Sequence, residues 1–225
     1  MYKRAIVFFL TALMAGNLAI SPAVATESKI IDLVVKGGPA SATDFTKIKI
    51  DSRLYLPEVT PAPAVILAHG FGGSKESVSS QAEMLQENGF SARGFGKTNA
   101  QISMNSPKFE IADGIALVDF LANRKEVKKS KSGDPIVGVA GGSYGGAFSL
   151  LLAGYDKRID ALASDITWNN LESALFNQSA SLEIPGVFKE MWTGFFFSVG
   201  MATPPELINV CGRFSVDWCI AYLAA

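Results

Sequence analysis

The chain has 225 residues and a formal net charge of −1, with 48% hydrophobic and 18% charged residues. This length fits one domain of ordinary size, and the composition predicts a substantial buried core and excludes wholesale disorder. Nucleic acids select clustered lysine and arginine, so the balanced charge excludes a typical nucleic-acid-binding protein. The lysine-rich residues 124–131 are interpreted as a solvated helix end and loop.

The first 25 residues have the pattern of a signal peptide. Lys3 and Arg4 precede an apolar run over residues 5–18, and residues 23–25 (Ala-Val-Ala) offer the small residues of a cleavage site. Cleavage there would change the net charge from −1 to −3, because it removes two basic residues and no acidic ones. An uncleaved anchor is the alternative. We expect export, to the medium or the cell surface, with no membrane contact after cleavage.

Strands and helices alternate along the next part of the chain. Apolar and β-branched runs predict five strands, the first two at a sheet edge, over residues 30–35, 46–56, 64–68, 136–140 and 161–166. Apolar spacing and small residues predict three helices, over residues 77–88, 111–121 and 144–153. This alternation predicts an α/β fold, in which a parallel sheet carries helices on both faces.

The pattern changes after Trp168, where only helices are predicted, over residues 171–176, 186–200 and 205–223. We therefore divide the mature chain into a core over residues 26–170 and a truncated helical cap over residues 171–225. The second part contains an aromatic cluster, Phe188, Trp192, Phe195, Phe196 and Phe197. Packing against the core is the favoured interpretation of this cluster, and a cap that lines an acyl-binding pocket is the alternative.

The two cysteines, Cys211 and Cys219, lie close together in the sequence. In an exported protein they form either a disulfide or a pair of buried free thiols, and both interpretations stay open. The chain has one histidine, which argues against a Cys/His metal site. No cofactor is expected.

Residues 141–145 (Gly-Gly-Ser-Tyr-Gly) fit the G-x-S-x-G pattern of a nucleophile elbow and are followed by Gly146. An apolar strand is predicted before the pattern and a helix rich in small residues after it, as an elbow requires. Such a sharp turn strains the serine backbone and needs small neighbours, which the glycines supply. The pattern predicts Ser143 as a catalytic nucleophile.

A second motif, residues 69–73 (His-Gly-Phe-Gly-Gly), follows the predicted strand at 64–68. In this fold a backbone N–H of that loop joins the N–H that follows the nucleophile to form the oxyanion hole. We therefore predict that the N–H groups of Phe71 and Tyr144 form this hole. His69 itself is interpreted as a structural residue that makes hydrogen bonds within the loop.

These motifs, with residues 91–96 (Ser-Ala-Arg-Gly-Phe-Gly), resemble the Xaa-Pro dipeptidyl-peptidase-like and cocaine-esterase-like α/β-hydrolases. The resemblance runs from about residue 45 to the end, and residues 166–169 and 211–219 are similar to exported actinobacterial members. It implies acyl transfer to water through an ester on Ser143. The implied substrates are peptides with a penultimate proline or small esters.

The sequence departs from this pattern after Ser143, because it contains no later histidine that could act as the base. Of the later acids, Asp165 lies at a predicted strand end and is a candidate for the catalytic acid, but it is interpreted as a surface or cap-hinge residue. Asp160 and Asp217 are weaker candidates. We expect impaired hydrolysis. The alternatives are a non-catalytic remnant or binding module, and a fragment that a separate C-terminal fragment complements.

A second departure from the family pattern lies just before Arg93, after the helix that is predicted to end at Gly89. Only residues 90–92 stand between them, and three residues span about 10 Å at most. We expect that they cannot form a whole strand and that the sheet is perturbed as well as truncated. Exposed edges and an uncovered apolar face would then favour aggregation or pairing with a partner.

Overall fold

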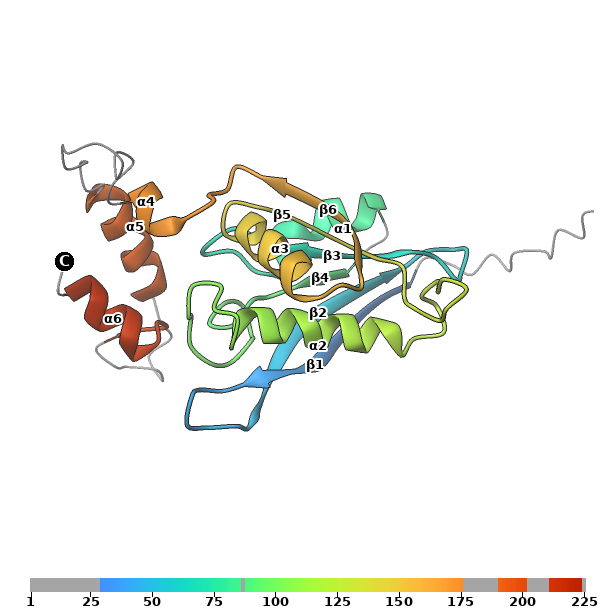
Figure 1. Ribbon diagram of the computed structural model, residues 1–225, viewed down its shortest axis with the longest axis horizontal. Coiled ribbons are helices and arrows are strands. Elements are labelled where there is room, and N and C mark those ends of the chain that lie inside the picture. The colour runs from blue at the N-terminus through green and yellow to red at the C-terminus, as the bar shows by residue number, and fades with distance from the viewer. Residues whose placement is uncertain (1–28, 86–87, 176–189, 202–210, 224–225) are drawn as a thin grey trace, which may run out of the picture.

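The structure is a computed structural model that describes residues 29–85, 88–175, 190–201 and 211–223 (Figure 1). The predicted signal peptide and Phe188 lie outside these residues. Within them, one six-stranded sheet has the order β1-β2-β4-β3-β5-β6. The strands are β1 (Lys29–Pro39), β2 (Lys47–Leu56), β3 (Ala64–Ala68), β4 (Asn88–Phe90), β5 (Val137–Gly142) and β6 (Ile159–Asp165).

The described helices are η1 (Lys75–Val78), α1 (Ser79–Leu85), α2 (Glu110–Ala122), α3 (Tyr144–Tyr155), α4 (Leu171–Leu175), α5 (Glu190–Met201) and α6 (Val216–Leu223). Strands β4, β3, β5 and β6 are mutually parallel, whereas β1 and β2 pair antiparallel at one edge. Helices α2 and α3 cover one face of the sheet and α1 lies on the other (Figure 1). The predicted α/β fold with helices on both faces is therefore confirmed, with a mixed rather than wholly parallel sheet.

Strand β3 explains why both faces need covering. Ile66 and Ala68 belong to the main core cluster with α2 and α3, whereas Leu67 packs with Ala82 of α1 in a smaller cluster on the other face. Successive side chains of a strand point to opposite faces, so an unbroken apolar run places apolar groups on both. The sequence Ala-Val-Ile-Leu-Ala of β3 satisfies this requirement.

The prediction of a helix that extends to Asn88 is wrong, and a short strand of three residues, rather than a whole strand, precedes Arg93. Helix α1 ends at Leu85, and Asn88–Phe90 forms β4, which pairs parallel with β3 and antiparallel with β2. The hydrogen-bonding edges of two neighbouring strands decide this conformation, and helical spacing in the sequence carries no signal of them. Three residues are enough because each contributes to both ladders.

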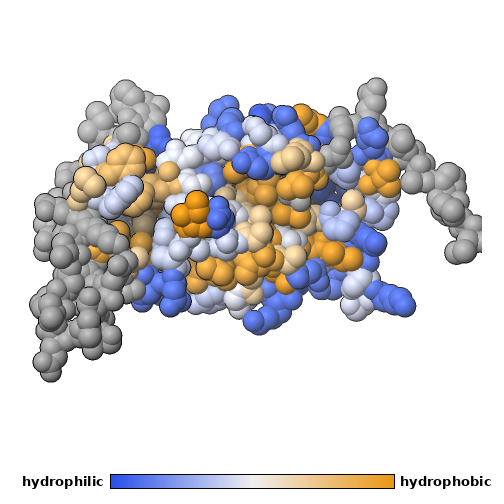
Figure 2. Space-filling view, turned by 90° about the horizontal axis from the view of Figure 1, so that it is seen from above, coloured by the Kyte–Doolittle hydropathy of each residue, from blue (hydrophilic) through white to orange (hydrophobic). Residues whose placement is uncertain are grey.

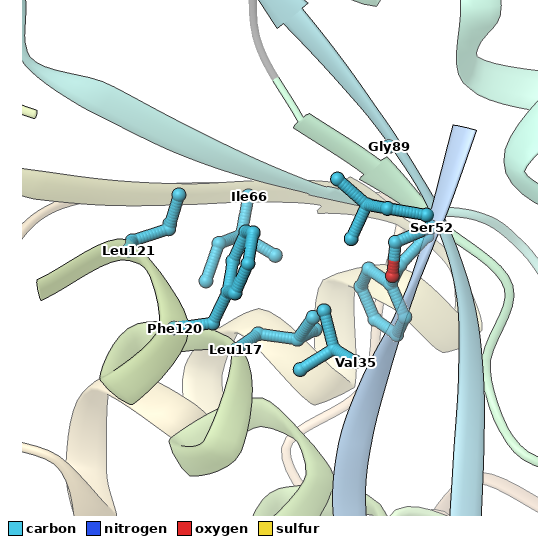
Figure 3. A pocket seen from close by; sticks show the side chains of 9 residues that line it. Val35, Ser52, Ile66, Gly89, Leu117, Phe120 and Leu121 are labelled. Atoms are coloured by element: carbon cyan, nitrogen blue, oxygen red, sulfur yellow. The ribbon is translucent and has the colours of Figure 1, made fainter. Parts of the chain in front are cut away.

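A small apolar cavity lies between the sheet and α2 (Figure 3). It is lined by side chains of four strands and the helix, Leu33, Val35, Ser52, Ile66, Gly89, Phe90, Leu117, Phe120 and Leu121. Its volume of about 10 Å³ is at the lower limit for a single water molecule. The cavity is therefore a packing gap and is too small for a substrate.

Strand β6 lies at the edge of the sheet with almost all of its residues exposed, although its sequence is largely apolar. Leu162 is 44% exposed, and Ile166, directly after the strand, is 84% exposed with a positive φ of 45°. Hydrophobic side chains gather on the side of the molecule seen in Figure 2. The expected exposed edge and apolar surface are thus present in the described part of the chain.

Helices α4, α5 and α6 lie together at the end of the sheet toward which β6 runs (Figure 1). Of the helices predicted here, the one starting at residue 186 is described only from Glu190. The one predicted over residues 205–223 is wrong for residues 211–215, which form a turn and a bridge, and is confirmed from Val216. Cys211 and Cys219 form a disulfide, which resolves the two interpretations of these cysteines. In the described ranges, none of the helices has the length and hydrophobicity needed to cross a membrane.

Candidate active site

Ser143 stands at the sharp turn between β5 and α3, and its backbone has φ 53° and ψ −116°. A positive φ at a residue with a side chain is strained, and such strain gathers at functional sites. The serine is partly exposed, whereas the neighbouring Tyr144 is 2% exposed. The strand, turn and helix of the predicted elbow are therefore all present, with Ser143 at the turn.

The glycines on both sides of Ser143 allow the helix to pack directly on the sheet. A Cβ atom on Gly145 would lie 2.1 Å from the carbonyl oxygen of Ala68, and one on Gly141 would lie 2.6 Å from the backbone of Gly145. A Cβ on Gly146 would lie 2.9 Å from the carbonyl oxygen of Asp165. Real Cβ atoms do not approach other atoms this closely, so these positions require glycine.

Hydrogen bonds from the end of β6 and the residues that follow it hold the turn in place. The N–H of Ser143 donates to the carbonyl oxygen of Asp165 at 2.9 Å, and the Thr167 hydroxyl donates to the carbonyl oxygen of Ser143, also at 2.9 Å. The Ser164 hydroxyl donates to the carbonyl oxygen of Gly146 at 3.0 Å. Such bonds are needed because a strained backbone persists only where its surroundings fix it.

The loop after β3 lies beside the serine. A Cβ on Gly70 would stand 3.9 Å from the Cβ of Ser143, and the Phe71 ring packs edge-to-face on the Tyr144 ring with centroids 5.4 Å apart. Tyr144 is the first residue of α3, so its N–H has no partner within the helix. The structure thus brings Ser143, Phe71 and Tyr144, the three predicted site residues, into one place.

His69 is 2% exposed and uses both ring nitrogens within the protein. Its Nδ1 lies 2.7 Å from the carbonyl oxygen of Gly70, and its Nε2 accepts the N–H of Ala92 at 3.0 Å. These bonds fit a neutral ring that donates from Nδ1, and burial lowers the pKa of His69. The ring ties the loop after β3 to the segment after β4, as the structural interpretation predicts.

Asp160, Asp165 and Asp217 are the candidates for the catalytic acid. In the part of the chain that the structure describes, none of them lies in an arrangement that orients a catalytic base. Asp165 and Asp217 are exposed, and Asp165 contributes its carbonyl oxygen to the turn. The Asp160 carboxylate accepts the N–H of Val137 at 2.9 Å, at the opposite end of β6. Within the same ranges, histidine, cysteine and acidic side chains form no cluster suited to a metal ion.

Aromatic side chains from the C-terminal helices reach the loop that carries Phe71. The Phe71 ring packs edge-to-face with Phe196 of α5 at 5.6 Å between centroids, and Phe214 stacks on Phe197 at 5.2 Å. Phe197 and Phe214 pack with the main core, whereas Trp192 is 51% exposed. Packing against the core is therefore confirmed for the inner part of the aromatic cluster.

Sequence reasoning missed a buried polar network beneath the elbow. The Glu110 side chain is buried at the start of α2 and accepts the N–H groups of Ser103 and Ser106 at 2.5 and 2.9 Å. Asn105 donates to the hydroxyl and the carbonyl oxygen of Tyr144 at 3.2 and 3.0 Å. A glutamate at a helix start is an ordinary surface pattern, so only the fold reveals these contacts.

Comparison with known proteins agrees with this geometry. A family model described as the alpha/beta hydrolase fold matches residues 63–200, which is more than half of the chain. The chain therefore belongs to the α/β-hydrolase fold family.

Two further matches show how much of such a protein the chain represents. It is similar to the thiohydrolase aneE of Aspergillus aculeatus, with 33% identity over 52% of this chain and 37% of the relative. It also resembles the crystal structure of a hypothetical protein from Pseudomonas aeruginosa, with a TM-score of 0.54 and 21% identity, over 72% of this chain and 50% of that one. The chain thus spans half or less of the length of each.

Proposed function

We propose that the chain is a serine hydrolase of the acyl-transfer type, with Ser143 as its nucleophile. The serine oxygen attacks the acyl carbon, its proton passes to a base, the leaving group departs and water later releases the acyl group. The N–H groups of Phe71 and Tyr144 stabilise the negative oxygen that forms. The strained backbone of Ser143, placed beside the loop of Gly70, is the observation that carries this proposal.

We further propose that hydrolysis by this chain alone is impaired. His69 is the only histidine, and both of its ring nitrogens are engaged away from the serine hydroxyl. Without an adjacent base a serine hydroxyl is a weak nucleophile. The same observation favours a second candidate, a non-catalytic binding module that keeps the anion pocket and performs no turnover.

The proposed substrates are acyl compounds of three kinds. The resemblance of residues 69–75, 91–96 and 141–146 to Xaa-Pro dipeptidyl-peptidase-like and cocaine-esterase-like hydrolases favours peptides with a penultimate proline or small esters. Similarity to a protein named as a thiohydrolase adds thioesters. A proline dipeptide anilide, an acetyl ester and an acyl thioester, each with a chromophoric reporter, would separate these classes.

A fluorophosphonate probe tests the nucleophile and the missing base together. We expect negligible labelling of the purified protein, and labelling that rises with added imidazole, because imidazole can supply the absent base. Ser143→Ala is the matched control and should stay unlabelled at every imidazole concentration. Labelling without imidazole would contradict the proposal that the base is missing. A protein that stays unlabelled at every imidazole concentration would contradict Ser143 as the nucleophile.

The partner proposed for this site is a C-terminal polypeptide fragment that supplies the acid and the histidine. Strand β6 supports it, because its apolar residues are exposed at a sheet edge where a further parallel strand could pair (Figure 1). In this fold those two residues follow the nucleophile in the chain. The nucleotide sequence after codon 225 provides the test: a frame encoding strands with Asp and His supports the proposal, and its absence refutes it.

Export is likewise a proposal, with residues 1–25 as a signal peptide, residues 26–170 as the core and residues 171–225 as a helical cap region. The disulfide between Cys211 and Cys219 supports it, because disulfides persist in oxidising compartments. Mass spectrometry of protein from the culture medium should find Thr26 at the N-terminus. An intact N-terminus would favour an anchored form at the cell surface.

A further inference from the structure

The segment between β4 and α2 holds three non-glycine residues with positive φ, Ala100 (79°), Met104 (54°) and Asn105 (58°). Each such residue costs about 1–3 kcal/mol unless its surroundings fix it. Two of the three are adjacent, and Asn105 is 3% exposed. A strained turn is therefore buried against the nucleophile elbow, and something must hold it there.

The carboxylate of Glu110 restrains this turn through hydrogen bonds. Its carboxylate is 1% exposed, and its two oxygens separately accept the N–H groups of Ser103 and Ser106, which flank the strained pair. A carboxylate that receives two backbone donors restrains both ends of the turn at once. Its side chain also lies 3.5 Å from the hydroxyl of Tyr144.

Asn105 connects the restrained turn to the nucleophile elbow through hydrogen bonds to Tyr144. Its side-chain amide donates to the carbonyl oxygen of Tyr144 at 3.0 Å, and its backbone N–H reaches the Tyr144 hydroxyl at 3.2 Å. Tyr144 is thus held at its backbone and at the tip of its side chain by one turn. Its own N–H, one bond away from Ser143, is the proposed oxyanion donor.

We propose that Glu110 is a positioning residue for the nucleophile elbow and sets the orientation of the Tyr144 N–H through Asn105 and the Tyr144 hydroxyl. This inference rests on the proposed function for its consequence in catalysis. The coupling from Glu110 to Tyr144 is itself a property of the fold. It can be measured whether or not the protein turns over a substrate.

The charged and titratable groups that face Glu110 are Arg93, Asp113 and the Tyr144 hydroxyl. Burial raises the pKa of Glu110 to about 7, with the Ser103 N–H and the Arg93 charge opposing the shift. Asp113 is paired with Arg93 through two bonds of 2.8 and 2.9 Å, so it keeps its partner while Glu110 titrates. The orientation of the elbow is therefore expected to change with pH near neutrality.

Nuclear magnetic resonance of protein labelled with ¹⁵N-tyrosine tests the coupling. The chain has five tyrosines, and the Tyr144 amide signal is the one that disappears in Tyr144→Phe. Between pH 5.5 and 8.5 this signal should move with a midpoint near 7, whereas the Tyr155 amide at the far end of α3 should not. The Glu110 carboxyl carbon, labelled with ¹³C, should share that midpoint in the unaltered protein.

Glu110→Gln should abolish the movement of the Tyr144 amide, and Glu83→Gln, on the exposed side of α1, should preserve it. A Tyr144 amide that is insensitive to pH, or that titrates unchanged in Glu110→Gln, would overturn the proposal. If Glu110→Gln does not fold, the shared midpoint in the unaltered protein decides the question, and different midpoints refute it.

Imidazole-supported labelling of Ser143 then measures the consequence for the site. Glu110→Gln should slow it by about tenfold, less than the 10²–10³ expected for complete loss of an oxyanion donor. If the unaltered protein is not labelled at all, the proposed function fails while the amide titration still reports on the positioning. If labelling occurs and Glu110→Gln leaves its rate unchanged, the positioning role fails and the proposed function stands.

Discussion

Replacing Ser143 by glycine isolates the strain of the elbow from its chemistry. The φ of 53° and ψ of −116° at this residue lie outside the regions that side chains favour, and such a conformation costs about 1–3 kcal/mol. Glycine adopts it without this cost but loses about 0.5–1 kcal/mol through the greater freedom of its unfolded chain. We expect Ser143→Gly to be more stable than the unaltered protein by about 0.5–2 kcal/mol.

The control is Ser143→Ala, which removes the hydroxyl but keeps the Cβ atom and therefore the strain. Urea unfolding followed by circular dichroism measures both free energies of unfolding, and each kcal/mol corresponds to about 2–4 °C in Tm for a domain of this size. We expect the unaltered protein and Ser143→Ala to agree closely and Ser143→Gly to exceed both. Equal stability of the two variants would refute the argument that this backbone is strained.

Three other substitutions test the packing, the buried carboxylate and the disulfide. Gly145→Ala should destabilise the protein by about 3 kcal/mol or more, because its Cβ would lie 2.1 Å from the Ala68 carbonyl oxygen. The control is Gly154→Ala, whose Cβ would have nothing within 4 Å and which should stabilise the protein by about 0.5–1 kcal/mol. Equal stabilities of the two variants in urea would contradict the predicted clash. Because burial raises the folded-state pKa of Glu110 to about 7, its contribution to stability is present below pH 4.5 and is lost as the pH rises through 7. The free energy of unfolding of Glu110→Gln should therefore change with pH by up to about 3 kcal/mol less than that of the unaltered protein over this range. Parallel pH profiles of the two proteins would refute this prediction. Cys219→Ser opens the disulfide loop and should lower the free energy of unfolding by about 2–3 kcal/mol, with reductant giving the same loss in the unaltered protein and none in the variant.

Much of the fold was predictable because its signals are local. The apolar run of β3 and the glycines around Ser143 are consequences of burial and of close backbone approach, and both can be recognised in the residues themselves. The disulfide between Cys211 and Cys219 could not be decided from the sequence, because the sequence gives the number of residues between two thiols and not their distance in space.

Strand β4 shows where local signals mislead. Asn88 was predicted to end a helix that Gly89 caps, yet Asn88–Phe90 forms a strand because β2 and β3 offer unpaired edges on both sides. No residue of β4 encodes that pairing. The helix was predicted correctly as far as Leu85, and the error began where tertiary hydrogen bonding replaced side-chain periodicity as the deciding factor.

The sequence by itself determined the turn at Ser143, the loop of Phe71 and the absence of a later histidine, because glycine spacing and residue identity are properties of the chain. Only the tertiary structure decided that His69 is engaged on both nitrogens and that Glu110 lies beneath Tyr144. These side chains come from loops and helices far apart in sequence, and their contacts arise when the sheet brings the carboxyl ends of its strands together.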